Sequence, residues 1–194
     1  MPRLLQLWIN FTLRIIDRHN KNMGFEFDKL SVLIVEDTMP MRELFTTILS
    51  NLGIKEIHTA TNGEQAFESF KRENQDIILT DWVMSPMDGL ELTKEVRTNT
   101  LSPNRMVPII LITGYSAWPR VAKARDAGVT EFLVKPFTAK DIARRLAHVI
   151  THPRNFIETS DFFGPDRRRR KDPTYSGPMR READQKAYSP KGDD

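Results

Sequence analysis

The 194-residue chain contains no cysteine, which excludes disulfide bonds, zinc–thiolate sites and a catalytic thiolate. It also lacks a long hydrophobic run. Gln6, Asn10 and Arg14 interrupt the most apolar segment well before the roughly 18 apolar residues that a membrane-spanning helix needs. With 28% charged residues, the composition is typical of a soluble globular protein. We therefore expect a cytoplasmic protein without a membrane span.

The middle of the chain has no excess of either charge. Residues 28–150 carry 15 basic and 16 acidic residues, against 4 and 2 in residues 1–27 and 10 and 8 in residues 151–194. A nucleic-acid-binding domain normally carries its basic excess on the folded part. The distribution therefore disfavours DNA binding.

Five segments have the pattern of strands, and most of them are continuous apolar runs typical of strands buried on both faces. They are Ser31–Asp37, Lys55–Ala60, Asp76–Asp81, Val107–Thr113 and Glu131–Val134. Segments with helical spacing lie between them, with apolar stripes such as Leu44, Phe45, Ile48, Leu49 and Leu52, and Ile142, Leu146, Val149 and Ile150. Capping residues predict helix starts at Thr38, Thr61, Ser116 and Thr138. The alternation predicts an α/β fold with a five-stranded parallel sheet, doubly wound, in three α/β/α layers.

The two ends differ from this pattern. Residues 1–28 form an N-terminal extension in which Leu4, Trp8, Phe11 and Ile15 line one side of a possible amphipathic helix, and Met23 is an alternative start. Residues 151–194 are rich in proline, glycine and charge, so we expect a disordered basic tail after a domain at 29–150.

Polar residues follow the predicted strands at the edge where ligands bind in a doubly wound sheet. They are Glu36, Asp37, Asp81, Thr113 and Lys135. Three carboxylates brought together need a cation, and oxygen ligands without cysteine favour Mg²⁺. Lys135 and Thr113 would then stabilise an anionic group delivered to Asp81, which makes Asp81 a candidate nucleophile for phosphoryl transfer.

Four segments at these positions resemble the receiver domain of bacterial two-component response regulators, the CheY-like family with a flavodoxin-like fold. They are L-I-V-E-D (33–37), D-W-V-M-S-P-M-D-G (81–89), I-T-G-Y (112–115) and F-L-V-K-P-F (132–137). The resemblance implies a single-domain response regulator, a signalling protein and not a classical enzyme. It would catalyse only its own phosphorylation and dephosphorylation. Asp81 would accept a phosphoryl group from a histidine kinase or histidine phosphotransfer protein.

The resemblance also implies roles for the neighbouring residues. Glu36, Asp37, Asp81 and the backbone carbonyl of Val83 would bind Mg²⁺, and Lys135–Pro136 would be a cis peptide bond. Thr113 and Phe132 would act as a switch that changes a protein-interaction surface on the last two helices and strand. Val83 and Tyr115 border the path of the attacking water in the family, and their bulk predicts slow self-dephosphorylation. Ser85 stands where the family usually has proline, so the loop after Asp81 is expected to differ in shape.

Other interpretations stay open. A pair of acids at a strand end is often only a solvated terminus, Thr113 alone could be a strand-end hydroxyl, and Phe132 alone could be a core residue. His58, His148 and His152 share no spacing or acid partner and are expected at the surface or in packing. The alternative function is a receiver-fold adaptor whose tail, with Arg167–Lys171, binds a protein or nucleic-acid partner. The downstream target is not identified by the sequence.

Overall fold

The structure, a computed structural model, describes residues 27–114, 118–160, 162–166 and 186–188. The expected N-terminal helix and the predicted helix start at Ser116 lie outside these residues. Five strands form one parallel sheet in the order β2-β1-β3-β4-β5. They are β1 (Ser31–Val35), β2 (Glu56–Ala60), β3 (Ile77–Asp81), β4 (Ile109–Thr113) and β5 (Glu131–Val134). This is the doubly wound order expected from the alternating pattern.

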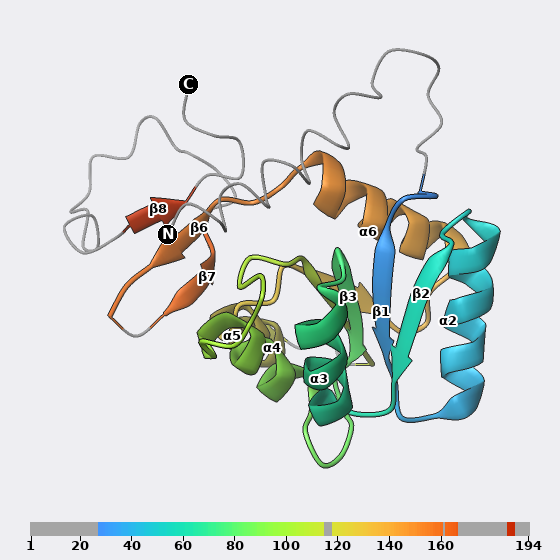
Figure 1. The fold of residues 1–194 in the computed structure, drawn as a ribbon, viewed down its shortest axis with the longest axis horizontal. Helices are drawn as coiled ribbons and strands as arrows, with labels where there is room; N and C mark the ends of the chain where they lie inside the picture. Colours follow the sequence, from blue (N-terminus) through green and yellow to red (C-terminus); the bar gives the residue numbers. More distant parts are fainter. Residues whose placement is uncertain (1–26, 115–117, 161, 167–185, 189–194) are drawn as a thin grey trace.

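Helices cover both faces of the sheet, as Figure 1 shows. They are α2 (Met39–Asn51), α3 (Gly63–Glu73), α4 (Gly89–Thr98), α5 (Trp118–Ala127) and α6 (Ala139–Thr151). None of the described helices combines the length and the apolar character needed to cross a bilayer.

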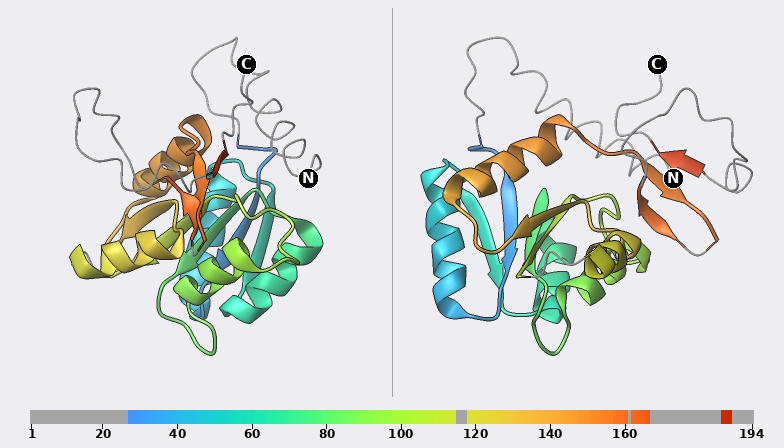
Figure 2. Two further views of the ribbon diagram at one scale, coloured as in Figure 1. Left: turned by 90° about the vertical axis from the view of Figure 1, so that its left-hand side faces the viewer. Right: turned by 180° about the vertical axis from the view of Figure 1, so that it is seen from behind.

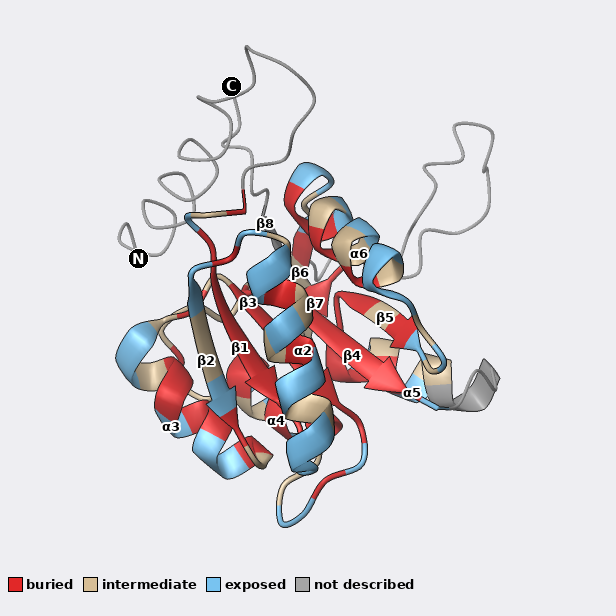
Figure 3. Cartoon of the chain, turned by 90° about the vertical axis from the view of Figure 1, so that its right-hand side faces the viewer, coloured by how far each residue is buried: buried red, intermediate tan, exposed pale blue. Residues whose placement is uncertain are grey.

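The alternation of side chains along the strands divides the core in two. Val32 and Ile34 of β1 face α2 and α6, where they meet Phe45 and Leu146 among others. Leu33 and Val35 face the other way and pack in the cluster that contains α3 and α4 residues. Figure 3 shows the buried central strands between helices whose outer faces are exposed. All five residues of β1, β3 and β4 are buried, which explains their unbroken apolar runs.

Most predicted helix starts are close to the observed ones. Thr38 is the N-cap of α2, and Thr138 forms a capping box with Asp141 at the start of α6. The prediction at Thr61 is wrong by one residue, because the side chain of Asn62 accepts the capping hydrogen bond from the Gln65 N–H. Thr61 instead donates its hydroxyl to the Gln65 side chain at 2.7 Å.

The described residues after Ile150 differ from the expectation of a disordered tail. Helix α6 continues to Thr151, and three short strands follow: β6 (Phe156–Glu158), β7 (Phe163–Pro165) and β8 (Lys186–Tyr188). They form an antiparallel sheet in the order β7-β6-β8. Figures 1 and 2 show this small sheet beside α4 and α5, at the end of the main sheet where the parallel strands begin.

Candidate functional site

Four neighbouring strands bring the predicted site residues to one edge of the sheet. Glu36 directly follows β1, Asp81 is the last residue of β3, Thr113 is the last residue of β4, and Lys135 directly follows β5. The register pairs Asp81 with Ile112 and Thr113 with Val134. The convergence therefore follows from the parallel topology.

Asp81 and Lys135 form the centre of the site. The Lys135 Nζ donates to Asp81 Oδ1 at 2.7 Å and lies 3.7 Å from Glu36 Oε2. Asp81 is 8% exposed, whereas the Lys135 side chain is 31% exposed. One cation thus faces two nearly buried carboxylates at an opening to solvent.

Glu36 is held on one side only. Its Oε1 accepts hydrogen bonds from the Thr38 N–H at 3.2 Å and from the Thr38 hydroxyl at 2.6 Å. Its Oε2 is buried and has no hydrogen-bond partner among the described residues. Burying a carboxylate oxygen without a hydrogen bond costs folding free energy unless a cation compensates its charge. Among the described residues, Lys135 is the only cation paired with this oxygen, at 3.7 Å.

Asp37 does not take the place that the sequence analysis predicts. It is exposed, and its backbone carbonyl, like that of Glu36, accepts from Arg42 Nη1. Within the described ranges, no three His, Cys, Asp or Glu side chains are grouped so as to hold a metal ion. Glu36 and Asp81 therefore lie together, whereas the Asp37 side chain lies apart from them, because the chain turns outward one residue after the buried Glu36.

The remaining oxygens still suit Mg²⁺. This ion retains several waters and commonly uses only one or two protein carboxylates, so it does not require a cage of three acids. Glu36 and Asp81 provide those carboxylates, and Glu36 Oε2, which accepts no hydrogen bond from the described residues, is a suitable ligand atom. Val83 lies on the exposed loop after Asp81, where its amide N–H is 3.3 Å from Asp81 Oδ2.

The residues predicted to switch, Thr113 and Phe132, lie on the strands β4 and β5. Thr113 is buried, and its carbonyl accepts from the Lys135 N–H at 2.8 Å, which fixes the backbone that carries the lysine. Phe132 is half-buried and packs on the cluster that includes Trp82, Leu90 and Leu111. The Lys135–Pro136 peptide is cis, as expected, and so is Ser85–Pro86 in the loop after Asp81. Tyr115 lies outside the described residues.

Gly89 is a site residue that the sequence analysis missed. A Cβ atom at this position would lie 2.2 Å from the Asp81 carbonyl oxygen and 2.9 Å from Leu111. Only glycine therefore lets the start of α4 approach the end of β3 so closely. The Asp88–Gly89 pair was the available signal, because Asp88 caps α4 from the adjacent position.

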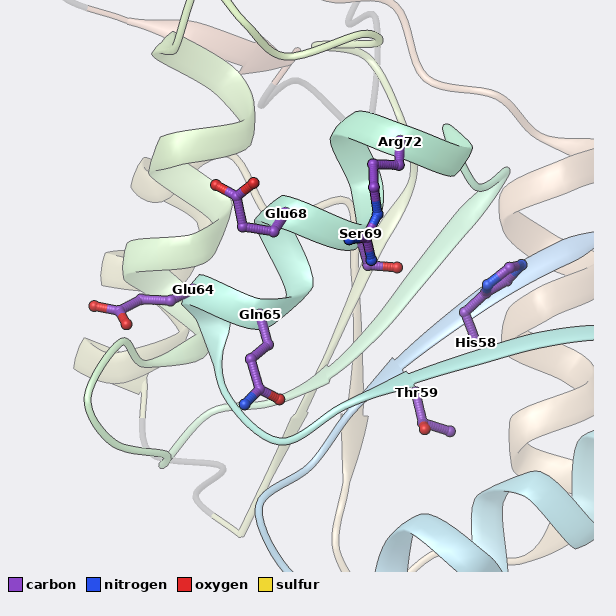
Figure 4. A pocket seen from close by; sticks show the side chains of 7 residues that line it. All are labelled: His58, Thr59, Glu64, Gln65, Glu68, Ser69 and Arg72. Carbon is purple, nitrogen blue, oxygen red and sulfur yellow. The ribbon is translucent and has the colours of Figure 1, made fainter.

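A second hollow lies away from these residues, between β2 and α3 (Figure 4). Its lining is polar and consists of His58, Thr59, Glu64, Gln65, Glu68, Ser69 and Arg72. None of the predicted site residues contributes to it.

Comparison with known proteins identifies the family. A family model for the response regulator receiver domain matches residues 32–147, which is more than half of the chain. The chain belongs to the response regulator receiver family. Chemotaxis protein CheY1 of Helicobacter pylori is 34% identical over 122 residues, which are 62% of this chain and 97% of CheY1. CheY-3 of Vibrio cholerae is 32% identical over 127 residues, or 66% of this chain and 91% of CheY-3.

Solved receiver structures show the same fold. The receiver domain of the sensor histidine kinase PA1611 from Pseudomonas aeruginosa is 30% identical, with a TM-score of 0.57 over 63% of this chain and 98% of that domain. That structure has a magnesium ion coordinated in its active-site cleft. CheY4 of Vibrio cholerae has a TM-score of 0.57 at 28% identity, covering 62% of this chain and 98% of its own. These receivers match the main sheet and its helices, and this chain is longer than they are.

Proposed function

We propose that Asp81 is the phosphoacceptor of this receiver and takes its phosphoryl group from a histidine kinase or a histidine phosphotransfer protein. The contact of Asp81 Oδ1 with Lys135 Nζ at 2.7 Å, beside the buried Glu36, carries this proposal. A receiver domain is a signalling protein and not a classical enzyme. The only chemistry assigned here is therefore the chain's own phosphorylation and its reversal.

In the proposed phosphoryl transfer, the protein contributes mainly positioning and charge stabilisation, and Asp81 is its only covalent participant. A carboxylate oxygen of Asp81 attacks the phosphorus atom and forms a P–O bond, while the P–N bond to the donor imidazole breaks. The electron pair of the P–N bond stays on the imidazole nitrogen, and this nitrogen then takes up a proton. Lys135 is already within hydrogen-bonding distance of Asp81, so its charge can stabilise the transferring phosphoryl oxygens without rearrangement of the fold.

Mg²⁺ is the cofactor that this proposal includes. When bound, it neutralises negative charge on the phosphoryl oxygens. Asp81 and the Val83 carbonyl are proposed ligands, together with Glu36 and Asp37, which would hold the ion directly or through water. The buried Glu36 Oε2, which accepts no hydrogen bond from the described residues, supports the assignment.

The proposed output is a change in the surface formed by α5, β5 and α6. Thr113 would move toward the phosphoryl oxygens, and Phe132, which is half-buried, would turn further inward. The proposed modulators of phosphoryl lifetime are Val83, whose side chain is 63% exposed beside the site, and Tyr115.

The test is intact mass spectrometry of the full chain after incubation with acetyl phosphate and Mg²⁺. Wild type should gain the mass of one phosphoryl group, and Asp81→Asn should not. Asp126→Asn is the matched control, because Asp126 is exposed on α5 and lies outside the site. It should react like wild type. A mass gain that persists in Asp81→Asn would show that another group is the acceptor.

A further inference from the structure

Two histidines lie together at the end of α6. His148 is in the last turn of the helix and His152 is its C-cap, so the two are four residues apart on one side of the helix. Their rings are stacked, with centres 4.9 Å apart and planes inclined by 20°. Both residues are exposed, as expected, but the expectation that they share no spacing is wrong. Two histidines at this helical spacing can bind one metal ion from the same face.

A chain of hydrogen bonds fixes the tautomer of His152. The Thr151 hydroxyl oxygen lies 2.7 Å from the Ala147 carbonyl oxygen and 2.8 Å from His152 Nδ1. A carbonyl oxygen only accepts, so the hydroxyl donates its one proton to Ala147, and its oxygen accepts from the Nδ1–H of His152. The neutral imidazole of His152 therefore keeps its lone pair on Nε2. A hydrogen bond from the other ring nitrogen is also what orients histidines that bind metals in proteins.

Negative charge lies beside His148. Its Nε2 is 3.6 Å from Glu131 Oε2, which is too long for a hydrogen bond, and Glu131 is only 7% exposed. The other oxygen of Glu131, Oε1, accepts from the Phe132 N–H at 3.0 Å and lies 3.5 Å from Arg145 Nη1. The C-terminal end of α6 adds the negative end of the helix dipole. A cation bound at His148 Nε2 would be stabilised by both.

The donor atoms select the class of ion. Imidazole nitrogens suit Zn²⁺, Cu²⁺ and Ni²⁺, whereas Mg²⁺ prefers oxygen ligands. Because no three His, Cys, Asp or Glu side chains of the described residues are grouped around one ion position, water would complete the coordination. A zinc–nitrogen distance of about 2.1 Å requires the two stacked rings to tilt toward each other. Exposed side chains make such rotations within nanoseconds.

We propose that His148 and His152 bind one divalent transition-metal ion of the Zn²⁺ class through their Nε2 atoms, with Glu131 beside it. Glu131 begins β5, whereas Lys135 follows the end of this strand, so the ion and Asp81 lie at opposite edges of the sheet. The ion would fix the last turn of α6, where the chain leaves for the C-terminal hairpin, formed by β6 and β7 (Figure 1). This site does not depend on the proposed function of Asp81.

Isothermal titration calorimetry of the full chain with ZnCl₂, in an excess of Mg²⁺, tests the site. His148→Ala and His152→Ala should each weaken the binding of Zn²⁺ at least about tenfold, since even the loss of a residue that only supports a ligand has an effect of this size. His58→Ala is the matched control, because His58 lies on β2 and pairs with Glu56. It should bind Zn²⁺ like wild type, and so should Asp81→Asn.

Two results of the titration would overturn the proposal. One is a wild-type chain that does not bind Zn²⁺, and the other is a wild-type affinity in either His148→Ala or His152→Ala. Loss of Zn²⁺ binding in Asp81→Asn would also overturn it, because the ion would then sit at the site of the proposed phosphoryl transfer. Phosphorylation of Asp81 is measured separately, so each of these results leaves the proposed function to its own test.

Nuclear magnetic resonance of the histidine rings tests the ligand atoms in the wild-type chain. Before Zn²⁺ is added, His152 should be in the tautomer with the proton on Nδ1, and Zn²⁺ should then shift the Nε2 resonances of both His148 and His152. Thr151→Val removes the hydroxyl, so it should release the tautomer of His152 and weaken Zn²⁺ binding about tenfold with both imidazoles retained. A shift confined to one of the two rings would reject the proposal.

Discussion

Lys135 is the residue whose charge the proposed chemistry needs most. Its Nζ is 2.7 Å from Asp81 Oδ1, and removing one preorganised charge of this kind commonly slows a reaction about 100-fold. We therefore expect Lys135→Met to accept a phosphoryl group from acetyl phosphate about 100-fold more slowly than wild type. Stopped-flow or timed mass measurements give the rate.

Lys140→Met is the control for this prediction, because Lys140 is exposed on the first turn of α6. It should phosphorylate at the wild-type rate. Circular dichroism should show that Lys135→Met keeps its fold, since the lysine side chain is 31% exposed and the core does not depend on it. A rate within twofold of wild type would remove Lys135 from the mechanism.

The positions of single site residues were predictable to different degrees. Asp81 and Lys135 meet because parallel strands end at one edge, and the apolar runs locate those ends in the sequence. The exposure of Asp37 was not predictable, because it depends on the turn taken after Glu36 and on the contacts of Arg42. Gly89 was missed because a close backbone approach leaves no pattern in the sequence beyond the Asp88–Gly89 pair.

At the scale of the element, we predict from the cap at the start of α6 that part of the protein's stability depends on pH. Asp141 Oδ2 accepts from the Thr138 hydroxyl at 2.7 Å and from the Thr138 N–H at 3.0 Å. These bonds, with Arg144 and Arg145 nearby, hold the pKa of Asp141 below its ordinary 3.8. A lowered pKa in the folded state stabilises the protein above the ordinary pKa, and this contribution is lost as the pH falls through the pKa of the folded state.

Thr138→Ala should therefore cost about 1 kcal/mol of unfolding free energy at pH 7. It should also raise the pKa of Asp141 toward its ordinary value, because the largest cause of the shift is the hydrogen bond from Thr138. Urea titrations at pH 7 and below pH 3.8 should show a smaller difference from wild type at low pH. Nuclear magnetic resonance should report the change in the pKa of Asp141.

Thr151→Ala, at the other end of α6, is the matched control because its hydroxyl donates to Ala147 and not to the cap. It should leave the pKa of Asp141 unchanged. An Asp141 pKa that stays low in Thr138→Ala would assign the shift to the backbone N–H of residue 138 and to the arginines instead.

The elements of the receiver followed from periodicity and capping, whereas the C-terminal hairpin did not. Strands β6 and β7 have three residues each, too few for an alternating pattern to be recognised. The surrounding proline, glycine and arginine residues are typical of disorder. Phe156 and Phe163 were the signal for a packed segment, and their rings lie 5.6 Å apart in the structure.

The whole molecule combines a core built on both faces of the main sheet with a hairpin held at its edge. Phe45 belongs to the core between α2 and the sheet and stacks on Phe137 with ring centres 5.3 Å apart. Phe156 is almost as deeply buried, but it lies between the hairpin and Arg97. Equal burial does not imply equal stability, because a segment can open without unfolding of the rest.

Truncation of these two phenylalanines should show how much the core and the hairpin each contribute to the free energy of unfolding. Phe45→Ala should lower the free energy of unfolding by about 3–5 kcal/mol, the usual cost of a large cavity in a core. Phe156→Ala should lower it by less, because the hairpin can open locally while the core stays folded, and the loss cannot exceed the free energy of that local opening. Urea denaturation measures both values. Equal losses would mean that the hairpin unfolds only together with the core.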